Sequence, residues 1–281
     1  MNPVQQTTIP TAAVRGTSLA RERRRELLKL LLLARGLERT ISGARGAAPT
    51  ADLGGREAIL TAVAASSAAA PNDRLVAPHA WLAAHLASGA GPAEIFAARA
   101  RAPRGRRSGR PLWPGIGPQS STGIGVGIAL AIALGRSGGA SDAVLAFADR
   151  RWDTDQAHIG ALSLARELEL PLVVVAIDPS RVPDRGESTV DRTDFEAVVA
   201  TVATALGTAR EHRRPALVEC AAVAAPESAA AGRMSRFAGK ADPVAGYERR
   251  LMIGGFSRAE LDEIERAAAT ELRRALGGPG R

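Results

Sequence analysis

The chain has 281 residues, of which 46% are hydrophobic and 3% aromatic, and its formal net charge is +8. This length and apolar content predict a globular protein with one large core, and the scarcity of aromatic rings argues against a single-stranded nucleic-acid binder, which needs stacking platforms. Lys29 and Lys240 are the only lysines among the 37 basic residues, so the charge comes almost wholly from arginines along the chain.

The single cysteine, Cys220, sits in the apolar run PALVECAAV, where a thiol behaves as a small buried hydrophobe. One cysteine allows neither an internal disulfide nor a thiolate zinc site. The polar N-terminus lacks the apolar segment of a secretory signal, and the longest apolar run, Ile124–Leu134, is too short to span a bilayer. We therefore expect a soluble, cytoplasmic protein without a membrane segment.

The N-terminal part predicts a flexible arm over residues 1–17, followed by a long amphipathic helix. Apolar residues recur there at three- and four-residue spacing, while most arginines fall off the stripe. The stripe consists of Leu27, Leu30, Leu31, Ala34, Leu37 and Ile41. Four shorter elements follow: a helix over Gly55–Ala69, a strand over Asp73–Ala77, and helices over Trp81–Ser88 and Pro92–Arg99.

Residues 101–110, RAPRGRRSGR, form the one clustered basic segment and predict an exposed loop. A basic nucleic-acid-binding module acting through this loop is one alternative function, although no aromatic residues interleave with its arginines. The glycines at 123, 125 and 127 do not follow a strand, so they predict a small-residue helix rather than a dinucleotide fingerprint.

Beyond Gly139, apolar runs alternate with helical patterns. The runs are Ala143–Ala148, Leu172–Ile177 and Ala216–Ala222, and the helices between them cover Asp155–Glu169 and Asp194–Ala209. Apolar strands joined by helical crossovers predict an α/β fold: a doubly wound, mostly parallel sheet with helices on both faces. We expect a single domain over 18–281 with a C-terminal helical extension, Pro243–Leu251 and Ser257–Leu276, the latter opening with a Ser257/Glu260 capping box.

Asp149 and Asp178 each follow a buried strand, and one crossover connects those strands. Ligands of parallel sheets bind beyond the carboxyl ends of the strands, and two carboxylates there can hold Mg²⁺ beside a diphosphate. Two other roles remain open: each aspartate can be a turn or cap residue, and Arg150 and Arg151 can neutralise Asp149 or bind an anion directly.

The segment AFADRRWDTDQAHIGALSLARELELPLVVVAIDPS, residues 146–180, resembles the core of the alpha subunit of thiamine-diphosphate-dependent 2-oxo-acid dehydrogenases. Gly55, Arg56, Glu57 and Ala58 resemble that family's Gly-Gln-Glu-Ala helix, and DRTDFEAVVATV resembles its Asp-Gly-Asn-Asp segment. The resemblance implies the thiamine-diphosphate-binding fold, thiamine diphosphate and Mg²⁺ as cofactors, and a beta-type partner in an α2β2 heterotetramer.

The site motifs depart from the family pattern. The family's Gly-Asp-Gly-Ala reads Ala148-Asp149-Arg150-Arg151 here, and the position of its metal-binding asparagine falls at or beside Asp178 and Pro179. The Tyr-Arg-X-His segment reads His79-Ala80-Trp81-Leu82, and the His-Ser-containing loop has no counterpart. Asp149, Arg150, Arg151 and Asp178 therefore remain the candidate cofactor residues, Asp149 and Asp178 the candidate metal ligands, and no catalytic residue is assigned.

Two functions follow from the resemblance. One is a structural or pseudoenzyme alpha-type subunit whose diphosphate and magnesium half-site is reduced or lost. The other is an active subunit that decarboxylates a 2-oxo acid, or transfers its acyl unit, with a beta-type partner.

Overall fold

The computed structural model describes residues 19–45, 55–77, 79–101, 142–148, 156–178, 189–221 and 242–277. The predicted arm over 1–17, the glycine run at 123–127, the apolar run 124–134 and residues 102–110 of the basic loop lie outside these ranges. Their predicted structures stay predictions.

A five-stranded, all-parallel sheet with order β1-β2-β3-β5-β4 lies at the centre of the fold. Its strands are β1 (Arg74–Val76), β2 (Val144–Ala148), β3 (Leu172–Asp178), β4 (Thr189–Asp191) and β5 (Ala216–Ala221). The predicted α/β class with a parallel sheet is thus confirmed. The sequence did not predict β4, because three residues with polar neighbours carry no measurable alternation.

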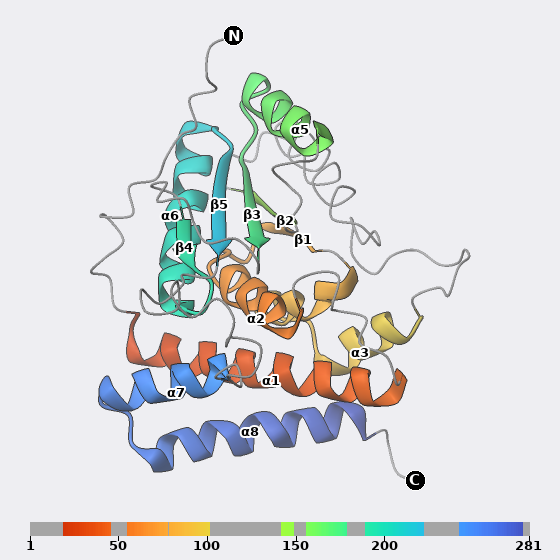
Figure 1. Cartoon of the computed structure of the whole chain (residues 1–281), viewed down its shortest axis with the longest axis vertical. Helices are drawn as coiled ribbons and strands as arrows, with labels where there is room; N and C mark the ends of the chain where they lie inside the picture. The colour runs from red at the N-terminus through yellow and green to blue at the C-terminus, as the bar shows by residue number, and fades with distance from the viewer. Residues whose placement is uncertain are drawn as a thin grey trace, which may run out of the picture.

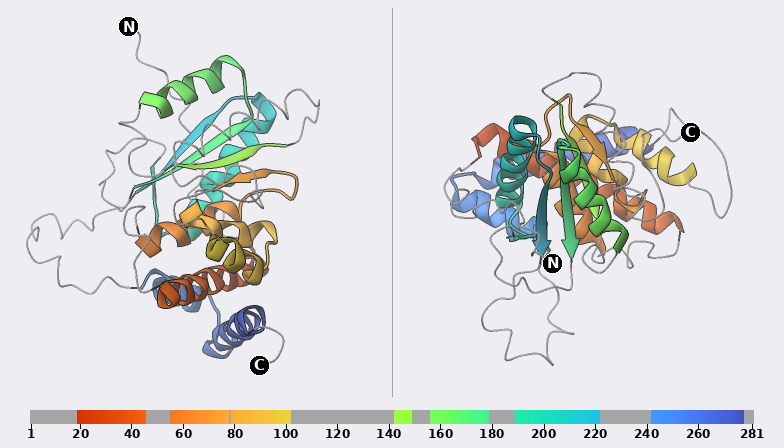
Figure 2. Two further views of the ribbon diagram at one scale, coloured as in Figure 1. Left: turned by 90° about the vertical axis from the view of Figure 1, so that its right-hand side faces the viewer. Right: turned by 90° about the horizontal axis from the view of Figure 1, so that it is seen from above.

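Helices cover both faces of this sheet (Figure 2). Helix α5 (Gln156–Glu167) packs on the face that carries Val144, Ala146 and Val174. Helices α2 (Gly55–Ser66) and α6 (Phe195–His212) pack on the opposite face, which carries the alternate residues of the same strands. Because successive side chains of a strand point to opposite faces, strands buried on both sides must be apolar throughout, as the sequence shows.

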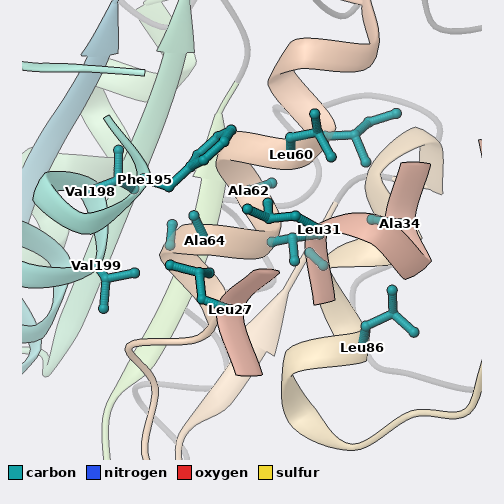
Figure 3. Packing of buried hydrophobic residues seen from close by; sticks show 14 of the residues in the cluster. Leu27, Leu31, Ala34, Leu60, Ala62, Ala64, Leu86, Phe195, Val198 and Val199 are labelled. Atoms are coloured by element: carbon teal, nitrogen blue, oxygen red, sulfur yellow. The ribbon is translucent and has the colours of Figure 1, made fainter. Parts of the chain in front are cut away.

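Further helices form layers beyond α2 (Figure 1). Helix α1 (Arg21–Arg45) lies against α2, and α7 (Pro243–Ile253) and α8 (Arg258–Leu276) lie against α1. Leucines of α1 meet alanines of α2 in a core built from small and branched side chains (Figure 3). Small side chains allow helices to approach closely, so this core reaches full burial with few aromatic rings.

One predicted helix takes a different form. Residues His79–Ser88 make a 3₁₀ helix, η3, rather than an α-helix, with Trp81 at φ −110° and ψ 26°. The Trp81 indole is fully buried, and its ring meets Phe147 of β2 edge to face at 6.1 Å between centroids. The backbone of η3 is kinked at Trp81, the residue whose large ring is buried against the sheet. The next helix, α3 (Pro92–Arg101), begins at the predicted proline.

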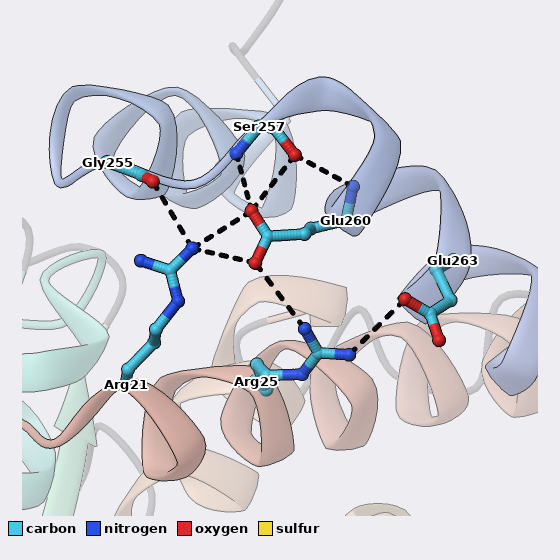
Figure 4. Close-up of polar contacts among 6 residues, drawn as sticks. All are labelled: Arg21, Arg25, Gly255, Ser257, Glu260 and Glu263. Atoms are coloured by element: carbon cyan, nitrogen blue, oxygen red, sulfur yellow. Dashed lines mark hydrogen bonds and ion pairs between the residues drawn. The ribbon is translucent and has the colours of Figure 1, made fainter.

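The outer helices are held by capping and ion pairs (Figure 4). The predicted capping box is confirmed: the Glu260 amide donates to the Ser257 hydroxyl, and the Glu260 carboxylate accepts from the Ser257 amide. Arg21 of α1 donates to Glu260 at 2.7 Å and stacks on the Phe256 ring. Hydrogen bonds from Arg21 and Ser257 lower the pKa of Glu260 to about 2.

Candidate functional site at the carboxyl edge of the sheet

The carboxyl ends of β3, β4 and β5 meet at one edge of the sheet. Asp178 of β3 and Asp191 of β4 both pair with Ala221, the last residue of β5, from opposite sides. Next along the sheet, Ala148 at the end of β2 pairs with Ala176, so β3 runs two residues further than β2. This is the edge at which parallel sheets bind ligands.

The predicted site residues belong to these strand ends. Asp178 is the last residue of β3 rather than a loop residue after it. Asp149 directly follows the end of β2, and Asp149, Arg150 and Arg151 lie outside the described residues. Neighbouring strands such as β2 and β3 lie about 4.8 Å apart, and Asp178 lies two residues beyond the position that pairs with Ala148. In the described part of the chain, no group of three or more His, Cys, Asp or Glu side chains is placed to hold a metal ion.

Two further aspartates, Asp191 at the end of β4 and Asp194 just before α6, have structural roles. The Asp191 carboxylate accepts hydrogen bonds from the Thr193 amide and hydroxyl, each at 2.8 Å. Asp194 caps α6 by accepting from the Ala197 amide, and it also pairs with Arg250 of α7 at 2.8 Å. These two carboxylates therefore shape the turn and anchor α6.

Arg192 lies between these two aspartates, and sequence reasoning missed its burial. Only 5% of the residue is exposed, although arginine is rarely buried. Its amide donates to the Ala221 carbonyl at 3.0 Å, and its carbonyl accepts from the buried Thr61 hydroxyl of α2 at 3.1 Å. The turn is thus tied to both β5 and α2. Periodicity gives no signal for this position, because it follows a strand of only three residues.

Cys220 of β5 lies just before this edge and is chemically quiet. It is fully buried, as predicted. Burial raises the pKa of its thiol strongly, and the nearby Glu219 and Asp191 carboxylates raise it further. The thiol therefore stays protonated at physiological pH and does not act as a nucleophile or a metal ligand.

The described histidine side chains also fit structural roles. His85 of η3 is 2% exposed, and burial lowers the pKa of its imidazole to about 4, so it is neutral at physiological pH. His212 is the last residue of α6 and is exposed. His79 and His158 lie in η3 and α5, and their side chains fall outside the description. In the described part of the chain, neither imidazole belongs to a group of three or more His, Cys, Asp or Glu side chains that could hold a metal ion.

Comparison with known proteins adds no relative. No protein-family model matches the chain, and no curated protein matches it. Among the helices that the structure describes, none combines the length and apolar character needed to cross a membrane.

Proposed function

We propose that this chain is an alpha-type subunit of a heterotetramer similar to the thiamine-diphosphate-dependent 2-oxo-acid dehydrogenases. In this proposal its own diphosphate and magnesium half-site is reduced or lost, and it pairs with a beta-type subunit. The observation that supports it most is the parallel register of β2 and β3. The resemblance rests on these two strands, and their carboxyl ends lie side by side at the edge where a cofactor would bind.

The segments of weaker resemblance also agree with this placement. The Gly55-Arg56-Glu57-Ala58 signature opens α2, and the Asp191–Asp194 segment joins β4 to α6. The hydrogen bond from Thr61, later in α2, to Arg192 ties the helix that this signature opens to the β4–α6 segment. This placement of the resembling segments supports the proposal that the chain keeps the architecture of an alpha-type subunit.

The residues at the strand ends fit a metal ion better than they fit a diphosphate. Carboxylates of Asp149 and Asp178 are suitable oxygen ligands for Mg²⁺. A diphosphate needs close backbone approach, for which glycine leaves room and Arg150 does not. Pro179 adds no side-chain ligand. Because the residues at the strand ends do not fit a diphosphate, we propose a subunit that contributes structure rather than a complete cofactor half-site.

A working enzyme is the second candidate, and the same strand register favours it. Asp149 and Asp178 would hold Mg²⁺, Arg150 or Arg151 would contact the diphosphate, and the partner chain would supply the catalytic acid. Thiamine diphosphate, when bound, would supply the chemistry for decarboxylating a 2-oxo acid or transferring its acyl unit.

Co-expression of the full chain with the product of its neighbouring gene, which the proposal expects to be a beta-type subunit, tests both candidates. The purified complex is incubated with thiamine diphosphate and MgCl₂, and bound cofactor is measured by calorimetry and by extraction. We expect a stable complex in which wild-type chain contributes no cofactor binding. A variant carrying Ala148→Gly, Arg150→Gly, Arg151→Ala and Asp178→Asn should gain binding, because it restores space and an amide ligand.

The control is Asp262→Ala, which removes a half-exposed carboxylate paired with Arg258 on α8, a helix that packs on α1. Failure of the two chains to associate would refute the alpha-type assignment. Tight cofactor binding that Asp149→Ala abolishes and Asp262→Ala preserves would refute the reduced half-site and establish the second candidate.

A further inference from the structure

We draw no further inference here: the strongest candidate, the acidic row of Glu219 and Asp191 on the β5–β4 part of the sheet beside its carboxyl edge, is an acidic cluster for which no second observation in the described part of the chain points to a ligand.

Discussion

Asp73 joins three segments at the amino edge of the sheet, and its removal should destabilise the fold strongly. Its side chain is 0% exposed. The carboxylate accepts from the Ala70 amide at 2.7 Å and the Ala143 amide at 3.0 Å. It also receives two N–H groups of Arg210 from α6, one of them from Nε at 3.2 Å. The start of β1, the start of β2 and the end of α6 therefore share one anion.

The expected cost of Asp73→Ala follows from these contacts. Removing one partner of a buried ion pair typically costs about 3–5 kcal/mol, because the other charge is left desolvated. The Arg210 side chain is 23% exposed, so water can solvate it in part and lower the cost. The two amides also lose a charged acceptor, each worth roughly 1.5–3 kcal/mol. Since these terms overlap, we expect about 3–4 kcal/mol in total, and roughly half of that for Asp73→Asn.

Urea unfolding followed by far-ultraviolet circular dichroism measures this cost. The control Asp262→Ala removes a half-exposed carboxylate that pairs with Arg258 at the surface, so it should change the free energy of unfolding by about 0.5 kcal/mol at most. In a double-mutant cycle, Asp73→Ala and Arg210→Ala together should cost clearly less than the sum of the two single changes. A cost below about 1 kcal/mol for Asp73→Ala, or simple additivity in the cycle, would show that Asp73 and Arg210 do not stabilise the fold as argued.

Three further predictions concern side chains whose environment the structure defines. The folded-state pKa of His85, about 4, lies below its ordinary value of 6.5, so the unfolded chain takes up the proton first and stability falls as pH drops from 6.5 towards 4. By linkage, this loss of unfolding free energy is up to about 3 kcal/mol. Urea unfolding at several pH values should show the loss in the wild type and not in His85→Gln. The same dependence of the unfolding free energy on pH in both proteins would contradict the prediction. Cys220 should resist Ellman's reagent in the native protein and yield one reactive thiol in denaturant, because burial raises its pKa and blocks access; rapid native-state labelling would show that β5 opens. Arg213, the C-cap residue that follows α6, has φ 47° and ψ 45°, a left-handed conformation that glycine adopts without strain. Arg213→Gly should therefore raise the unfolding free energy by about 0.5–1 kcal/mol, and a lower thermal midpoint would count against this reading.

Local patterns predicted the elements that carry strong periodicity. The apolar runs became β2, β3 and β5, and the Ser257/Glu260 pair became the capping box of α8. The site could be predicted only as far as strand ends. That two neighbouring parallel strands lead into Asp149 and Asp178 follows from the crossover between them, whereas the roles of these side chains remain predictions.

The sequence by itself determined the fold class, because strands buried on both faces are almost continuously apolar and their crossover helices are amphipathic. Only the tertiary structure decided the strand order, the existence of β4, the 3₁₀ form of η3, and the burial of Asp73, His85 and Arg192. The environments of Asp73 and Arg192, for example, depend on partners far along the chain: Arg210 for Asp73 and Thr61 for the Arg192 carbonyl. Contacts between residues so far apart produce no periodic pattern in the sequence. The two partners come together only when the sheet forms.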